Sequence, residues 1–115
     1  MPPLWIQVET GEGGGILLSV TGDLDAHHVK SMEAKFEELA ASRPGRMVLD
    51  LSALSYISSS GALCLLTNSR ALQEEGTRVV LVKPPGAIYE ILDLLGMTQL
   101  LTFVASREEA WAALK

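Results

Sequence analysis

The chain has 115 residues, of which 48% are hydrophobic and 20% are charged, a composition that predicts one globular domain over 1–115. Its formal net charge is −5 and no Lys/Arg cluster occurs, which argues against nucleic acid and membrane lipid as partners, because both recruit clustered cations. No apolar run reaches the roughly 20 residues that cross a bilayer, and the first residues lack the basic start of a signal peptide, so we expect a cytoplasmic protein. The single cysteine, Cys64, predicts a buried thiol and neither a disulfide framework nor a metal site, and since no phosphate loop or metal cluster occurs we expect no cofactor.

The first elements expected are two short strands, 4–8 and 16–20, which are rich in apolar strand-forming residues. The glycine-rich segment 9–15 between them predicts a flexible hairpin connection. It does not match a phosphate-binding loop, because the third glycine of G-x-G-x-x-G would fall at Ile16 and a strand follows instead of a helix.

Helices and strands then alternate. A turn over 21–25 leads into a helix with an apolar stripe, and Asp25 is placed to cap it. Segment 47–51 is apolar except for Asp50, as in the interior strand of a parallel sheet. The later elements expected are a helix over 60–75, a strand over 78–82, a helix ending at 95, a weak strand over 101–104 and a last helix opened by a capping box at Ser106. This order predicts an α/β fold in which a mixed, mostly parallel sheet with an N-terminal hairpin is packed with four helices.

Three consecutive serines, Ser58, Ser59 and Ser60, precede Gly61 at the expected start of the second helix, after a short loop that follows the 47–51 strand. The N-terminus of a helix offers free N–H groups and the positive end of the helix dipole, which favour an anion. A serine placed there either caps the helix or is recognised and modified by a partner. The residues alone favour a cap at Ser59 or Ser60.

Several landmarks of this chain occur in the order found in one family. They are 22–25 (GDLD), 48–61 (VLDLSALSYISSSG), the helix 85–95 followed by Gly96-Met97, and 106–110 (SREEA). On these landmarks the sequence resembles the STAS domain, and in particular the short stand-alone bacterial anti-sigma factor antagonists, over nearly its whole length. The resemblance implies that Ser59, two residues before the glycine, is the phosphoacceptor. Sporulation-type members often carry aspartate where this chain has Ser58, which leaves Ser58 and Ser60 as rival acceptors.

The resemblance also implies a partner-switching cycle. The unphosphorylated protein would bind an anti-sigma factor that is also a serine kinase of the histidine-kinase-like ATPase fold, and a sigma factor would be released. Phosphorylation would end the binding and a serine phosphatase would restore it. Asp23 and Asp25, in a neighbouring strand-to-helix loop, are expected to join Ser58, Ser60 and Gly61 in the partner-binding surface, although aspartates there also serve as turn and cap residues.

We expect no catalysis by this chain. A serine hydrolase of the G-x-S-x-G type would need glycine two residues before Ser59, where Ile57 stands. The adjacent His27 and His28 lack a third metal ligand and point about 100° apart on a helix. The alternative function is that of a non-switching STAS adaptor subunit of a transporter or stress-sensing complex. Nucleotide binding at the loop surface has no motif to support it.

Overall fold

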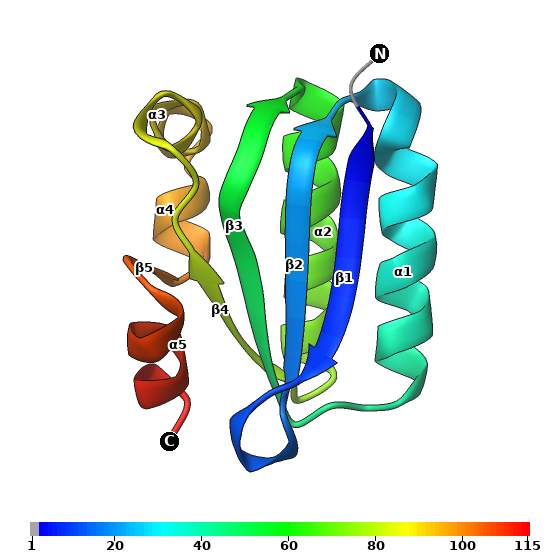
Figure 1. Cartoon of the computed structure of the whole chain (residues 1–115), viewed down its shortest axis with the longest axis vertical. Coiled ribbons are helices and arrows are strands. Elements are labelled where there is room, and N and C mark those ends of the chain that lie inside the picture. The colour runs from blue at the N-terminus through cyan, green and yellow to red at the C-terminus, as the bar shows by residue number, and fades with distance from the viewer. Residues whose placement is uncertain (1–2) are drawn as a thin grey trace.

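A five-stranded sheet organises the chain, and the computed structural model describes residues 3–115 (Figure 1). The strands are β1 (Leu4–Thr10), β2 (Ile16–Leu24), β3 (Arg46–Ile57), β4 (Arg78–Val82) and β5 (Phe103–Val104), and they lie in the order β1-β2-β3-β4-β5. The first two strands pair antiparallel and all later neighbours pair parallel. The mixed, mostly parallel sheet with an N-terminal hairpin is therefore confirmed.

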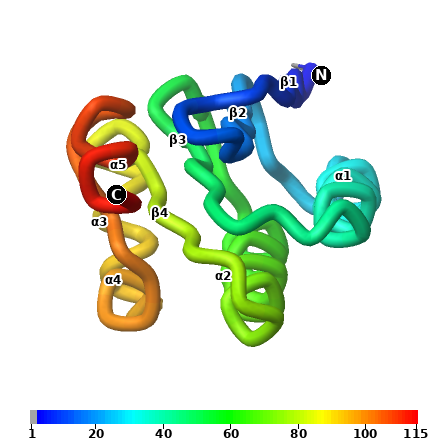
Figure 2. Tube along the Cα trace, turned by 90° about the horizontal axis from the view of Figure 1, so that it is seen from below, coloured from blue at the N-terminus to red at the C-terminus, as the bar shows by residue number. Residues whose placement is uncertain are grey.

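The helices cover both faces of this sheet. They are α1 (Val29–Ala41), α2 (Ser59–Glu74), α3 (Gly86–Leu94), α4 (Met97–Leu100) and α5 (Arg107–Ala113), with 3-10 turns η1 (Glu12–Gly14) and η2 (Ala26–His28). The four expected helices are present, and α4 adds a single turn after α3. Figure 2, viewed along the strands, shows α1 and α2 on one face of the sheet and α5 on the other. Over the described residues, no helix has the length and apolar character needed to cross a membrane.

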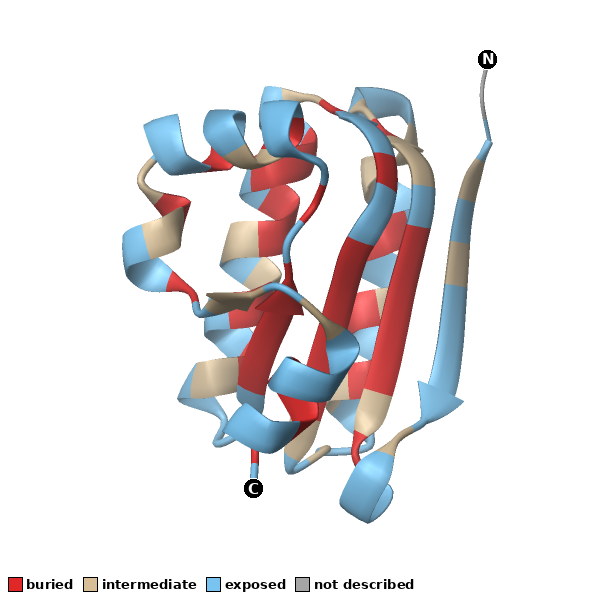
Figure 3. Cartoon of the chain, turned by 60° about the vertical axis from the view of Figure 1, so that its left-hand side comes forward, coloured by how far each residue is buried: buried red, intermediate tan, exposed pale blue. Residues whose placement is uncertain are grey.

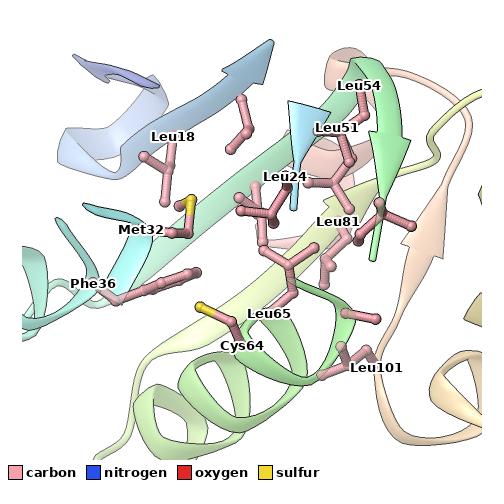
Figure 4. Close-up of a cluster of buried hydrophobic side chains, with 14 of the residues drawn as sticks. Leu18, Leu24, Met32, Phe36, Leu51, Leu54, Cys64, Leu65, Leu81 and Leu101 are labelled. Atoms are coloured by element: carbon pink, nitrogen blue, oxygen red, sulfur yellow. The ribbon is translucent and has the colours of Figure 1, made fainter. Parts of the chain in front are cut away.

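Two apolar clusters hold these layers together, and Figure 3 shows the buried residues concentrated in the central strands. The larger cluster lies between the sheet and the α1–α2 face, where Met32, Phe36 and Leu65 contact the inward residues of β2 and β3 (Figure 4). Cys64 belongs to this cluster as a free thiol, and burial raises its pKa to about 11. The smaller cluster, on the opposite face, contains Trp111 of α5.

The central strands are longer than expected. We expected β2 to end at 20 and β3 at 51, but Thr21 to Leu24 continue to pair with Ala53 to Ile57. Both the expected turn over 21–25 and the expected loop after 51 were therefore wrong. The register shifts twice along this stretch, and each time β3 contributes an extra residue. Beyond residue 50, these two bulges bury every third residue of β3, namely Leu51, Leu54 and Ile57, so the two-residue alternation typical of a strand is absent from this part of the sequence.

The second face is held by a polar contact as well as by packing. Asp50 of β3 is buried and accepts hydrogen bonds from the backbone N–H of Ser52 and from the guanidinium of Arg107, at the start of α5. Arg107 also donates to the hydroxyl of Ser19 at 3.1 Å. Burial raises the pKa of the Asp50 carboxyl, but the hydrogen bonds from Ser52 and Arg107 outweigh it and hold the pKa below its usual range.

Candidate functional site

The candidate site lies where β2 and β3 end, at the upper end of the sheet in Figure 1. Parallel neighbours end at the same side of a sheet, so the segments that follow them converge there. β2 leads into η2 and α1, while β3 leads through Ser58 into α2. The serine segment and the aspartate segment, which are separated in the sequence by more than one whole element, therefore form one surface.

Ser58 caps α2. Its backbone is extended, with φ −91° and ψ 169°, and its Oγ accepts a hydrogen bond from the backbone N–H of Gly61 at 3.0 Å. The same Oγ lies 3.1 Å from the hydroxyl of Ser60. The expectation that Ser59 or Ser60 caps the helix was therefore wrong, because the helix begins one residue earlier than the apolar pattern indicated.

Ser59 is left with a free hydroxyl. It is the first residue of α2 and it is exposed. Within residues 3–115, the structure contains no hydrogen bond to its side chain, whereas the hydroxyls of Ser58 and Ser60 lie within hydrogen-bond distance of each other. Of the three rival acceptors, Ser59 is thus the one whose Oγ is both exposed and unengaged at the positive end of the α2 dipole.

Gly61 brings the two halves of the site together. A Cβ at this position would lie 2.3 Å from the backbone oxygen of Leu24, the last residue of β2. The same oxygen accepts a hydrogen bond from the backbone N–H of Ser58 at 3.0 Å. Because Gly61 has no side chain, α2 can approach β2 closely at this point. Gly61 itself is buried, so the exposed part of the site at this helix start consists of the serines.

The two aspartates differ in how they are engaged. Asp25 was expected to cap α1, but it caps η2, the 3-10 turn before that helix, and His28 is the N-cap residue of α1. The carboxylate of Asp25 accepts from the backbone N–H of His28 at 3.2 Å and lies 2.9 Å from the Nδ1 of that residue. Asp23 pairs through its backbone with Tyr56, and no hydrogen bond to its side chain is present in the described part of the chain. Both side chains are half-buried. The carboxylate of Asp23 is therefore the more available of the two.

An apolar groove of about 230 Å³ lies beside Ser59. It is formed by Ser59 and the adjacent turns of α2 together with the segment that joins α3 to α4, and its lining residues are Ser59, Ala62, Leu63, Leu66, Leu95 and Met97. Leu63 is 58% exposed, and Leu94 at the end of α3 is 87% exposed. Sequence reasoning missed this groove, and the available signal was a leucine on α2 that falls outside the buried stripe of that helix.

Among residues 3–115, no group of three or more His, Cys, Asp or Glu side chains could hold a metal ion. His27 and His28 contact each other edge to face, with ring centroids 5.3 Å apart. The groups present at the site are hydroxyls, carboxylates and an apolar groove, and these are suited to recognition by another protein.

Comparison with known proteins identifies the family. The family model of the STAS domain matches residues 6–110. The chain belongs to the STAS domain family. A relative in Bordetella bronchiseptica, BtrV, is assigned as an anti-sigma factor antagonist and is 28% identical over 102 residues, which cover 89% of this chain and 88% of BtrV.

Solved structures share the fold of this STAS domain. An anti-sigma factor antagonist from Mycobacterium paratuberculosis superposes with a TM-score of 0.88 at 24% identity, covering 96% of this chain and 93% of that one. The Bacillus antagonist SpoIIAA, solved in unphosphorylated and phosphorylated forms, gives a TM-score of 0.72 at 21% identity in each case. These alignments cover 96% of this chain and 97% and 100% of the SpoIIAA chains.

The geometry explains how this STAS domain accommodates Ser58 where sporulation-type members often carry aspartate. Serine and aspartate are both strongly preferred N-cap residues, because each places an oxygen within reach of the N–H groups of the first turn. The hydrogen bond from Gly61 to Ser58 is such a cap. The departure from aspartate therefore preserves the start of α2.

Proposed function

We propose that this STAS domain is an anti-sigma factor antagonist controlled by phosphorylation of Ser59. In its unphosphorylated form it binds an anti-sigma factor that is a serine kinase of the histidine-kinase-like ATPase fold, and a sigma factor is released. The observation that carries the proposal is the exposed, unengaged hydroxyl of Ser59 at the start of α2, beside two serines whose hydroxyls face each other. The relatives reported above are named for antagonism of anti-sigma factors and not for a catalysed reaction.

The chemistry of the switch follows from the position of Ser59. Its hydroxyl attacks the terminal phosphoryl group of ATP held by the kinase, the bond to the bridging oxygen of ADP breaks, and the hydroxyl proton passes to a base of the kinase. The product carries about −1.5 to −2 charges and three strong acceptor oxygens. Because the free N–H groups of the first turn of α2 favour an anion, the domain stays folded, and a serine phosphatase can restore the hydroxyl.

The effect of the phosphate is therefore exerted on the partner. Ser59 lines the apolar groove together with Leu63 and Leu95, whose side chains are 58% and 52% exposed. We place an apolar side chain of the anti-sigma factor in this groove, where burial of such surface contributes about 25 cal/mol per Å². A dianion at the rim would have to lose water against that apolar contact, and a thousandfold loss of affinity requires only about 4 kcal/mol.

Charge adds to the recognition. The chain carries a net charge of −5, and Asp23, near the end of β2, has a carboxylate that the described residues leave unengaged. A partner with a basic contact face would associate faster with such a surface and would do so less well at high salt.

The test is a pull-down from the native cells with the purified chain and four variants. Ser59→Ala should retain a kinase-like partner, and Ser59→Asp should lose it. Ser58→Ala should retain it with a less stable α2. Ser55→Asp is the matched charge control, because Ser55 is an exposed serine of β3 outside the helix start, and it should retain the partner.

Two results would contradict the proposal. Equal recovery of the same partners with Ser59→Ala and Ser59→Asp would show that charge at this position does not control binding. Recovery of transporter subunits by every variant would support the alternative, a non-switching adaptor.

A further inference from the structure

The outer edge of β1 is a feature that the proposed function leaves unused. β1 and β5 are the terminal strands of the sheet, so no strand of residues 3–115 pairs with the outer edge of β1. α1 lies on the same side as this edge (Figure 1), but Figure 2 shows it set off from the plane of the sheet, on the helix-covered face. Figure 3 shows β1 as the last strand at its side of the sheet. An edge strand presents unpaired N–H and C=O groups that can pair with another strand. β5 is only two residues long, so β1, with seven, offers the one long edge in the described part of the chain.

The sequence of β1 lacks the features by which proteins protect such edges. Lysine, proline, bulges and short length all block pairing with a further strand. Leu4–Thr10 contains neither lysine nor proline, carries a single charge at Glu9, and pairs with β2 without a register shift. Two of its apolar side chains are exposed, Trp5 at 62% and Val8 at 40%. Pairing of this edge with a further strand is therefore favoured over its exposure to water.

We propose that β1 pairs antiparallel with β1 of a second copy of this chain, in the register that places Gln7 opposite Gln7 of the partner subunit. This register pairs all seven residues of the strand with a partner residue. It also closes on itself by two-fold symmetry, so the association stops at a dimer. A second copy is favoured over an unrelated peptide because the strand complements itself.

The self-complementarity can be followed face by face. Leu4 and Ile6 pack against the core on the helix side, and because side chains alternate along a strand, Val8 lies on that side too. The register sets Ile6 opposite Val8 of the partner subunit, twice by symmetry. On the other face it sets Trp5 opposite Glu9 of the partner subunit. The two Glu9 carboxylates thus lie at opposite ends of the ribbon and do not face each other.

The dimer would leave the phosphorylation site free. A two-fold axis normal to the sheet keeps the helices of both copies on one face and makes the two sheets continuous. Because the two β1 strands run antiparallel, the Ser59 surfaces lie at opposite ends of the ten-stranded sheet. Dimerisation is therefore independent of the state of Ser59, and each can fail without the other.

Sedimentation velocity of the full chain tests the dimer, over loading concentrations from about 1 μM to about 1 mM. The wild-type mass should rise toward twice the chain mass. Gln7→Lys places two like charges face to face and should weaken association at least about tenfold. An equimolar mixture of Gln7→Lys with Gln7→Glu should restore it, because the opposite charges then pair across the axis.

Glu9→Lys is the matched control. It also adds a lysine to β1 and so shares the general cost of a lysine on an edge strand, but its neighbour in this register is Trp5 of the partner subunit and not a second lysine, so it should weaken association clearly less than Gln7→Lys. Gln7 is exposed, and an unchanged thermal transition of Gln7→Lys will show that the monomer still folds. A wild-type chain that stays monomeric over the whole range would overturn the proposal. Equal weakening by Gln7→Lys and Glu9→Lys would also overturn it, because the register would then be wrong.

Discussion

Replacement of Gly61 by alanine tests whether the serine segment is held by the close approach of α2 to β2. The added Cβ would lie 2.3 Å from the backbone oxygen of Leu24 and 3.0 Å from its Cγ. Real Cβ atoms do not approach backbone oxygen so closely, so the start of α2 must move away from β2. That movement breaks the hydrogen bond from the N–H of Ser58 to the same oxygen, which is 3.0 Å long.

Two opposing effects set the magnitude. Alanine in a helix is more favourable than glycine by up to about 1 kcal/mol. Overpacking of a buried site costs about 1–3 kcal/mol, and a lost hydrogen bond with a buried partner costs about 1 kcal/mol more. The net expectation is a loss of about 1–3 kcal/mol. At about 4–6 °C per kcal/mol for a domain of this size, the melting temperature should fall by roughly 5–15 °C.

Urea unfolding followed by circular dichroism measures the effect, with Gly86→Ala as the matched control. Gly86 is also a helical residue in a first turn, that of α3, but a Cβ there would meet nothing within 4 Å. The control should therefore be neutral or stabilised by up to about 1 kcal/mol. Wild-type stability of Gly61→Ala, or an equal response of both variants, would refute the close-approach argument.

Three further predictions concern the rest of the fold. Gly11→Ala should cost about 2 kcal/mol in urea unfolding, because its Cβ would lie 2.0 Å from the ring of Trp111, and an unperturbed midpoint would show that the hairpin moves aside freely. Asp50→Asn should lose about 2 kcal/mol at pH 7 through its contact with Arg107. The pKa of Asp50 is lower in the folded than in the unfolded chain, so this contribution is present above about pH 4 and is lost as the pH falls through the folded pKa. The difference in unfolding free energy between wild type and Asp50→Asn should therefore narrow in acid. A difference that does not change with pH would count against the charged pair. Cys64, with a pKa of about 11, should react with a disulfide reagent at pH 8 at least about a hundredfold more slowly in the folded than in the unfolded chain, and similar rates would contradict its burial.

The fold could be predicted from the sequence where the signals are local. The helical stripes of α1 and α2, the mostly apolar segment 47–51 and the capping box at Ser106 each express their structure within a few residues. The extension of β3 could not be predicted in this way. Its buried residues recur every third position, and that spacing has no meaning until the two bulges against β2 are known.

The site was predicted in part for the same reason. The serines, Asp23 and Asp25 could be placed at one edge because parallel strands end together. The start of α2 is fixed by the contact of Ser58 and Gly61 with the backbone oxygen of Leu24, and Gly61 lies 37 positions from Leu24 in the sequence. This contact decides which serine caps the helix. The pairing of Asp50 with Arg107 spans 57 positions, and the groove beside Ser59 needs the α3–α4 segment in place. No local pattern encodes these contacts.

The proposed switch depends on phosphorylation of Ser59. The most direct measurement is fragmentation mass spectrometry of the protein purified from its own cells, with the phosphate localised within the peptide that contains Ser58, Ser59 and Ser60. We expect a single phosphate on Ser59, absent from the fraction of the protein that is bound to its partner. A phosphate on Ser58 or Ser60, or one that is equally abundant in the bound and free fractions, would contradict it.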